Sequence, residues 1–389
     1  MGRRAFVVVL DAVGAGATDD ATDYEDAGAN TLAHVADAVG GLRVPTLERL
    51  GLGNVTPLRG VAPVERPVVH GRLWPLGPGK DTTAGHWELM GASAPDWPTY
   101  PDGFPPAVVE AFERAAGRGV ICNERSEGLR AIEEYGARHV ATGELIVYTS
   151  TDSVFQVAAH VDVLPTAELH ALCEAARGLL TGEHAVGRVI ARPFEGEPGA
   201  FRRTPGRRDY ALPPEGPTYL DLLSEAGVHV CSVGKVSNVF AGRGVAEERP
   251  AHDNPTAIAA LDALFGELAD GLAFANLVDT DQVYGHRKDV EGFHAALREF
   301  DAAVARWIGA MGRDDLLVIT ADHGCDPASP GTDHTREHVP LLAVFAGGGG
   351  RRVDAPMAAV GATVHRWLTG RDADLPGEPF VDRDPAPAA

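Results

Sequence analysis

Cysteine is scarce in this chain. Four cysteines lie far apart in 389 residues, at positions 122, 173, 231 and 325, and no Cys-x-x-Cys pair occurs. Disulfide frameworks belong mainly to small secreted domains that cannot build a sufficient core, and structural zinc sites need paired ligands at short spacing. We therefore expect four reduced thiols, and neither a disulfide scaffold nor a zinc knuckle.

Long hydrophobic runs and an excess of positive charge are also missing. The first apolar run spans residues 5–10 and ends at Asp11, which is too short for a secretory signal, and no stretch approaches the roughly eighteen apolar residues of a membrane span. Lys and Arg number 34 against 55 Asp and Glu, and the resulting net charge of −21 disfavours nucleic-acid binding. The sequence predicts a cytoplasmic protein that needs no nucleic acid, no membrane and no obligate protein partner. A small phosphorylated substrate is compatible with this charge, because metal ions or a few cations can dominate locally.

What is present is typical of a soluble α/β protein. Apolar residues make up 44% of the chain and charged residues 23%, and the length favours two domains. Short apolar runs at 5–10, 272–278, 316–320 and 341–345 are typical of buried parallel strands, and 290–310 has helical periodicity with an acidic start. This alternation predicts a central, mainly parallel sheet with helices on both faces.

Prolines mark both ends of the middle of the chain. Five occur between residues 95 and 106, and four between 205 and 217. Strand-end acidic residues occur on both sides of this segment, which favours an inserted domain over two domains in tandem. We predict a core domain formed by residues 1–94 and 213–389, with an inserted α/β cap domain at 95–212.

Three of the predicted strands run directly into acidic or histidine-containing turns. Asp11 follows the first strand, Asp281 follows the second, and Asp322 and His323 follow the third. Ligands bind beyond the carboxyl ends of strands in open α/β sheets, so these side chains are expected to lie together. Further histidines follow at positions 286 and 334. Asp and His suit divalent ions such as manganese and zinc, and two such ions would relieve the repulsion among clustered carboxylates. The set predicts a two-metal site for phosphoryl transfer.

The segment 79–88, GKDTTAGHWE, offers a nucleophile in a glycine-flanked polar turn. A threonine hydroxyl is weakly nucleophilic at neutral pH unless a metal ion or a base activates it. The same Lys-Asp-Thr-Thr pattern is also typical of a helix N-cap. The pattern alone leaves both interpretations open.

Six longer segments lie between residue 5 and about residue 345. They are VVVLDAVGAG, GKDTTAGHWELMG, IVYTSTDSVFQVAAH, VGRVIARPFEGEPGAFRRTPGRRDYAL, NLVDTDQVYGHR and ITADHGCDPASPGTDHTREHVPLL. In this order they resemble the phosphopentomutases, a family of the alkaline phosphatase superfamily. The resemblance implies an alkaline-phosphatase-like core with an inserted cap. It also implies an isomerase that interconverts ribose 1-phosphate, or deoxyribose 1-phosphate, with the 5-phosphate.

The resemblance assigns roles to individual residues. It implies that Thr82 is phosphorylated and that a 1,5-bisphosphate forms as the intermediate, with a sugar bisphosphate needed to load the enzyme initially. Two metal ions, expected to be Mn²⁺, would be held by six ligands: Asp11, Asp322 and His323 for one ion, and Asp281, His286 and His334 for the other. The phosphorylated pentose would be held by Ser150, Asp152, Arg188 and Lys235. The run of Arg203, Arg207 and Arg208 adds local positive charge whose role stays open.

Two positions depart from the family pattern. Ala84 stands where a second threonine commonly follows the nucleophile, and Cys325 stands where asparagine is usual. Three alternatives remain beside the mutase. They are a phosphatase or phosphodiesterase that admits water, a phosphoglycerate mutase, which would be expected to use serine in place of Thr82, and a non-catalytic metal- or phosphate-binding protein.

Overall fold

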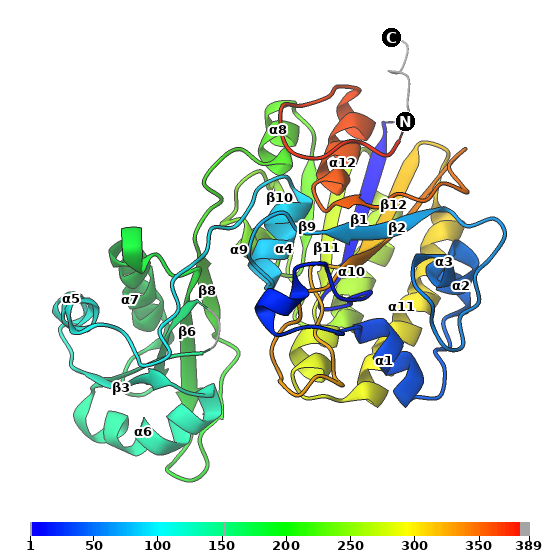
Figure 1. The fold of residues 1–389 in the computed structure, drawn as a ribbon. Coiled ribbons are helices and arrows are strands. Elements are labelled where there is room, and N and C mark those ends of the chain that lie inside the picture. Colours follow the sequence, from blue (N-terminus) through cyan, green and yellow to red (C-terminus); the bar gives the residue numbers. More distant parts are fainter. Residues whose placement is uncertain (1, 151–152, 382–389) are drawn as a thin grey trace. The chain divides into compact units, whose positions relative to one another are not determined.

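A computed structural model describes residues 2–150 and 153–381 of the chain (Figure 1). It divides into two compact units, one formed by Met1–Pro95 together with Pro214–Ala389 and the other by Asp96–Pro213. Among the described residues, no helix is long and apolar enough to cross a membrane.

The first unit is built on an eight-stranded sheet with the order β10-β9-β11-β1-β12-β13-β2-β14. The strands are β1 (Arg4–Leu10), β2 (Val69–Trp74), β9 (Val230–Val233), β10 (Glu247–Arg249), β11 (Gly271–Leu277), β12 (Asp315–Thr320), β13 (Val339–Phe345) and β14 (Ala355–Pro356). β1 is the centre of this sheet, because it pairs in parallel with β11 on one side and with β12 on the other. The predicted α/β class and the strands at 5–10, 272–278 and 316–320 are confirmed to within one residue at each end.

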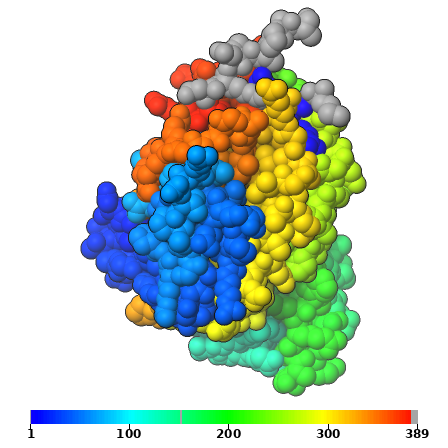
Figure 2. All heavy atoms as spheres, turned by 90° about the vertical axis from the view of Figure 1, so that its right-hand side faces the viewer, coloured from blue at the N-terminus to red at the C-terminus, as the bar shows by residue number. Residues whose placement is uncertain are grey.

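Two groups of helices cover opposite faces of this sheet (Figure 1). Figure 2 shows part of one group from the side, where the blue segment around residues 30–55 lies beside the yellow segment around residues 290–310. One group is α4 (Thr82–Leu89), α8 (Tyr219–Glu225), α9 (Val236–Val239) and α12 (Ala359–Thr369); the other is α1 (Thr31–Ala38), α2 (Pro45–Leu50), α3 (Leu52–Val55), α10 (Asn254–Glu267) and α11 (Val290–Ala310). Phe6 stacks on Phe265 of α10, whereas Phe274, which pairs with Val7 of β1, lies beside Phe240 and His86 on the other face. Successive strand residues face opposite sides, so the two helix groups are on different faces.

The strand at β13 corrects one prediction. The apolar run at 341–345 was expected to be parallel, but β13 runs antiparallel to both β12 and β2. A parallel neighbour needs a crossover that returns the chain to the opposite edge of the sheet. The connection 321–338 contains no helix and stays at the carboxyl edge of β12, so the next strand runs back in the opposite direction. A strand buried on both faces is apolar in either direction, and its composition therefore did not reveal this.

The second unit has its own six-stranded sheet and its own core. The sheet runs β3 (Val120–Arg125), β4 (Leu145–Thr149), β5 (Val154–His160), β6 (Arg188–Glu195) and β7 (Arg202–Arg203), with β8 (Arg208–Ala211) also paired to β6. Its helices are α5 (Pro106–Ala116), α6 (Gly128–Thr142) and α7 (Thr166–Leu179). Phe112, Val157 and Leu169 belong to the apolar cluster that includes α5 and α7, and Ile132 and Ile146 belong to the cluster under α6. Helices on both faces bury this sheet as well.

Candidate metal centre and nucleophile

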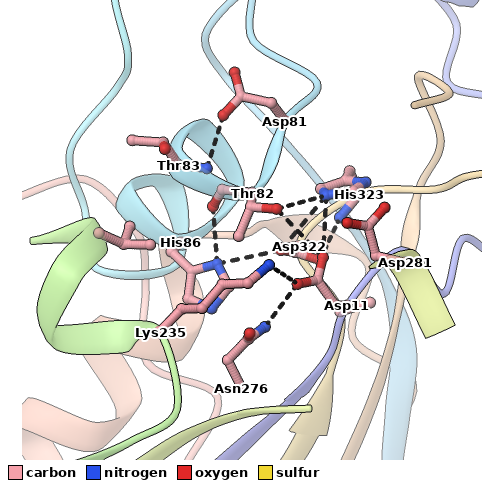
Figure 3. Close-up of polar contacts among 12 residues, drawn as sticks. Asp11, Asp81, Thr82, Thr83, His86, Lys235, Asn276, Asp281, Asp322 and His323 are labelled. Carbon is pink, nitrogen blue, oxygen red and sulfur yellow. Dashed lines mark hydrogen bonds and ion pairs between the residues drawn. The ribbon is translucent and has the colours of Figure 1, made fainter. Parts of the chain in front are cut away.

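Three neighbouring strands carry acidic residues to one edge of the first unit's sheet. Asp11 follows β1 and is fully buried, Asp322 follows β12, and Asp281 lies in a short π-helical turn, Thr280–Gly285, after β11. Ala12 has a left-handed φ of 66°, and its N–H donates to Asp322 Oδ1 at 3.1 Å. The hydroxyl of Thr280 donates to the Asp11 carbonyl at 2.6 Å. These bonds hold the ends of the three strands together, and Figure 3 shows Asp11, Asp281 and Asp322 side by side.

The carboxylates and imidazoles form two groups that share Asp281. Asp11, Asp281 and His323 form one group, and Asp281, His286 and His334 form the other, with all ligand atoms of a group within 4.8 Å of one another. His323 Nε2 is 3.3 Å from Asp11 Oδ1, and His334 Nε2 is 3.2 Å from Asp281 Oδ1. The remaining expected ligand, Asp322, borders the first group, with its Oδ2 3.6 Å from His323 Nε2. The structure therefore brings all six expected ligands together.

Two carboxylate oxygens in these groups fit a metal ion. Asp281 Oδ1 and Asp322 Oδ2 are buried and accept no hydrogen bond. Each lies beside imidazole nitrogens at ion-pair distance, and a buried carboxylate oxygen that accepts no hydrogen bond is costly, so a bound ion would explain both. Carboxylate oxygens beside imidazole nitrogens make up the donor set that manganese and zinc prefer. The residues present thus suit divalent ions.

Burial and charge shift the pKa values of this cluster in opposite directions. Burial disfavours the ionised form of Asp11, but Lys235 and His323 outweigh it and hold the pKa of this carboxyl well below its usual range. Burial and the Asp11 carboxylate likewise oppose ionisation of Asp281, yet His334 and His286 lower its pKa to about 2. Burial disfavours the charged form of His323, but Asp322 and Asp11 raise its pKa to about 10. Without metal, a proton on His323 partly balances the acidic cluster.

Thr82 is the first residue of α4 and faces this cluster. Its Oγ1 donates to Asp11 Oδ1 at 3.3 Å and lies 3.3 Å from His323 Nε2 (Figure 3). Asp81 caps the helix, with its Oδ1 accepting from the backbone N–H groups of Thr83 and Ala84 at 2.7 and 3.2 Å. The side chain of Thr83 points away from the ligands. The Lys-Asp-Thr-Thr pattern therefore does two things. Asp81 is the helix N-cap, and Thr82 places its hydroxyl beside the expected metal ligands.

Comparison with known proteins agrees with this geometry. A model of the Metalloenzyme superfamily matches residues 3–365. The phosphopentomutase of Caldanaerobacter subterraneus subsp. tengcongensis is 50% identical over 342 residues, 87% of each chain. That of Anaeromyxobacter sp. (strain K) is 49% identical over 374 residues, 95% of this chain and 96% of the other. The chain belongs to the phosphopentomutase family.

A solved structure shares the fold of this phosphopentomutase-family chain. The PH0037 protein from Pyrococcus horikoshii matches with a TM-score of 0.51 and 14% identity, over 96% of this chain and 99% of that one. At this identity the likeness concerns the fold alone. The family assignment depends on the sequence relatives and on the superfamily model.

Several contacts around the family's metal centre were missed from the sequence. Asn276 Nδ2 donates to Asp11 Oδ2 at 3.2 Å, and it is the one strongly polar side chain in the strand GLAFANL, which was an available signal. Lys235, expected to contact phosphate, lies with its Nζ 3.4 Å from the same Asp11 oxygen. His86, one helical turn after Thr82, lies between Thr82 and Asp322. The His86–Thr82 contact follows from helical spacing within one segment, but the contacts of Asn276, Lys235 and His86 with Asp11 or Asp322 join residues far apart in the chain.

Arg336 ties the loop before Thr82 to the segment that carries His334. Its Nη1 donates to the Gly79 carbonyl at 2.7 Å, its guanidinium pairs with Asp20 at 2.8 Å, and it lies over the Tyr24 ring at 4.8 Å. Lys80 adds a 2.7 Å ion pair to Asp26. This anchoring fixes the start of α4 close to the ligands.

The two departures from the family pattern are both buried. Ala84 packs against Gly79, where an added Cβ would lie 2.2 Å from the Ala84 methyl. Cys325 lies beside the π-helical turn, where a Cβ added to Gly285 would lie 3.0 Å from its sulfur, and burial raises the pKa of its thiol. Neither residue belongs to the two metal-ligand groups.

The expected sugar-phosphate residues of the second unit lie at strand ends. Ser150 follows β4, Arg188 begins β6, and Asp152 lies outside the described residues. Arg188 Nη1 is 3.5 Å from Asp209 Oδ2, and Arg207 contacts both Asp209 oxygens at 2.8 Å. Burial disfavours the charged form of Asp209, but Arg207 and Arg188 lower its pKa. The other two arginines of the run are directed elsewhere, Arg203 to Glu127 and Arg208 over the Tyr210 ring.

Metal binding to this family member should be pH-dependent. Because the pKa of His323 is raised to about 10 in the metal-free protein, this side chain is protonated at pH 7 and must lose its proton when a metal ion binds. Affinity for Mn²⁺ should therefore fall about tenfold for each unit that the pH drops across the range from 8.5 to 6.5. Isothermal titration calorimetry from pH 6.5 to 8.5, in two buffers of different ionisation enthalpy, measures both the affinity and the proton release. A constant affinity with no proton released would contradict the charge state inferred for His323.

Proposed function

We propose that this protein interconverts ribose 1-phosphate and ribose 5-phosphate, and the corresponding deoxyribose phosphates, through a phosphothreonine at Thr82. The observation that carries this proposal is the position of Thr82 Oγ1, 3.3 Å from both Asp11 Oδ1 and His323 Nε2 within the ligand cluster. Membership in the phosphopentomutase family supports the same substrate class.

The metal ions of the proposed site would be two Mn²⁺ held by the six ligands named above. When bound, divalent ions at such a site neutralise the charge on the transferred phosphoryl group and lower the pKa of the nucleophile. The protein's own contribution is orientation. Asp81 caps α4, and Arg336 holds Gly79, so the Thr82 oxygen has one position relative to Asp11 and His323.

The proposed reaction begins with Thr82 phosphorylated by a sugar bisphosphate primer. The free hydroxyl oxygen of the sugar monophosphate attacks phosphorus, the bond between phosphorus and Thr82 Oγ1 breaks, and the hydroxyl proton is released. The resulting 1,5-bisphosphate reorients, and Thr82 Oγ1, left deprotonated by the first step, attacks its other phosphorus. The bond from that phosphorus to the sugar oxygen breaks, and this oxygen takes up the proton released in the first step. Positive charge from Lys235, near Asp11, supports the accumulation of negative charge during each transfer.

We further propose that the second unit acts as a cap that holds the phosphate not being transferred. Ser150, Asp152 and Arg188 are the residues expected to do so. Support comes from the pairing of Arg188 with Asp209 at 3.5 Å, since Arg207 already contacts both oxygens of that carboxylate and would keep it neutralised. Arg188 is thus a guanidinium whose release from Asp209 would leave that carboxylate paired with Arg207. A cap that excludes water would also favour transfer to sugar over hydrolysis.

A coupled assay tests the proposal against its alternatives. Conversion of ribose 1-phosphate to ribose 5-phosphate is followed beside release of free phosphate, with 2- and 3-phosphoglycerate as additional substrates. The proposed mutase converts the pentose phosphate with little free phosphate. Dominant phosphate release would favour a phosphatase, and isomerisation of phosphoglycerate alone would favour the other mutase.

Arg188→Ala should lower mutase kcat/KM by roughly 10- to 200-fold, because a charge-assisted contact to phosphate contributes about 1.5–3 kcal/mol. The ratio of free phosphate released to isomer formed should rise, since a poorly closed cap admits water. The measurement is that ratio at saturating Mn²⁺. Arg114→Ala is the control, because Arg114 is an exposed arginine of the same unit, paired with Glu110 at 3.7 Å. An unchanged rate and ratio in Arg188→Ala would remove this residue from the proposed site.

A further inference from the structure

His86 is a fully buried histidine that has no assigned role in the proposed chemistry. It lies in α4, one turn after Thr82, and its Nδ1 is 2.8 Å from the Thr82 carbonyl oxygen and 3.2 Å from Asp322 Oδ2 (Figure 3). Its ring packs on Phe274 with the centroids 5.7 Å apart. One ring nitrogen thus reaches both the nucleophile residue and an expected metal ligand.

The chemistry of these neighbours fixes the state of that nitrogen. A backbone carbonyl oxygen and a carboxylate oxygen are both hydrogen-bond acceptors, so Nδ1 must carry a hydrogen. The other nitrogen, Nε2, is buried and has no hydrogen-bond partner. With the hydrogen on Nδ1, Nε2 carries the lone pair and accepts no hydrogen bond, so Nδ1–H is the group through which the ring is hydrogen-bonded.

His86 contacts one of the two oxygens of the Asp322 carboxylate. Its Oδ1 accepts from the backbone N–H groups of Ala12 and His323, both at 3.1 Å. Its Oδ2 has no such donor. The Nδ1–H of His86, which donates to the Thr82 carbonyl at 2.8 Å, lies 3.2 Å from Oδ2 and makes an electrostatic contact with it. The imidazole therefore limits the rotation of the carboxylate at the oxygen that is open to a metal ion.

We propose that His86 is a positioning residue that keeps the Thr82 nucleophile and the Asp322 ligand in fixed relation through a single Nδ1–H group. It belongs to neither metal-ligand group, and it acts through the Thr82 backbone and the Asp322 carboxylate. Residues behind metal ligands orient them, and loss of such a residue typically weakens metal binding by about 10- to 100-fold. This inference rests on the proposed two-metal function. Beyond that function, the inference means that the position of Asp322, and of an ion bound to it, depends on the position of the first turn of α4.

Three substitutions separate a positioning role from simple packing. His86→Asn places an amide N–H close to the position of Nδ1, His86→Gln places it closer to the position of Nε2, and His86→Leu removes the donor altogether. Mn²⁺ binding to the metal-free protein is measured by titration calorimetry, and the melting temperature is measured in parallel. We expect one of two Mn²⁺ sites to weaken about 10- to 100-fold in His86→Gln and His86→Leu. His86→Asn should stay within a few-fold of wild type.

His365→Leu is the matched control. His365 is a buried histidine of α12 whose Nδ1 also faces a backbone carbonyl, that of Arg371 at 3.0 Å. The C-terminal part of α12, which carries His365, lies beside the start of β1, whereas Asp11 follows its other end, because Trp367 of α12 donates to the carbonyl of Arg4. His365→Leu should lower the melting temperature without changing either Mn²⁺ affinity.

The outcomes are distinct. Selective weakening of one site, restored by Asn, supports the positioning role. If wild type binds two ions and all His86 variants match it, the inference is wrong while the proposed function stands. Equal weakening of both sites in all three variants, with a loss of melting temperature like that of the control, would assign His86 to packing and overturn the inference. If wild-type protein binds no Mn²⁺ and turns over without it, the two-metal function itself fails.

Discussion

Thr82→Ala should take up no phosphate from a sugar 1,5-bisphosphate, and its mutase turnover should fall by about 10⁴-fold or more. This is the loss expected when a covalent nucleophile is removed and the rest of the site remains. The physical reason is geometric, because Thr82 Oγ1 is the hydroxyl that faces Asp11 and His323. Intact-mass measurement after incubation with the bisphosphate, followed by peptide mapping, gives the number and position of phosphates.

Two neighbouring variants serve as controls for this result. Thr82→Ser retains the hydroxyl and should still become phosphorylated. Thr83→Ala removes the adjacent hydroxyl, which points away from the ligands, and should also accept one phosphate. A phosphate mapped to Thr83 in the wild-type protein would show that the nucleophile has been placed one residue early.

Asp281→Asn should cost the protein both bound metal ions and essentially all activity. Asp281 is the residue that the two ligand groups share, so replacing its carboxylate by an amide weakens both groups at once. His286→Ala should have a smaller effect, because His286 belongs to one group. Elemental analysis of the purified proteins gives the metal content, and the coupled assay gives the activity. EDTA should abolish wild-type turnover, and Mn²⁺ should restore it.

Asp279→Asn is the matched control for this prediction. Asp279 is a buried carboxylate two residues before Asp281, but its Oδ2 accepts from the Asn254 N–H at 3.0 Å and it belongs to neither ligand group. The same chemical change should leave the metal content at the wild-type level. Full activity of a metal-free preparation would contradict the metal requirement altogether.

The sequence predicted the parts of the fold whose signal is local. α11 has the bounds expected from its acidic start and its periodicity, and β1, β11 and β12 differ by at most one residue at each end from the apolar runs. The direction of β13 was wrong, because it depends on the path of the connection 321–338 and not on the residues of the strand. Strand direction is set by topology, and an apolar run does not carry it.

The candidate site likewise contains some residues that the sequence predicted and some contacts that it did not. Asp11, Asp281 and Asp322 were expected near one another because each follows a buried strand, and the structure places them together at three adjacent strand ends. The contacts of His86 and Asn276 could not be predicted in this way. Their roles depend on which face of α4 turns inward and on which strand lies beside β1. Both are features of the tertiary structure, which local sequence patterns do not specify.

The central place of β1 has a consequence for synthesis. Its partners β11 and β12 lie far along the chain, with 260 residues between Leu10 and Gly271. At about 5–20 residues per second, a ribosome needs roughly 13–50 s to reach β11 after completing β1. During that time β1 is an apolar segment without its native neighbours, a state prone to aggregation. The second unit is contiguous in sequence and can pair all its strands within this interval. Asp281 and Asp322 meet Asp11 only afterwards, so a metal ion cannot serve as a template for the early steps of folding.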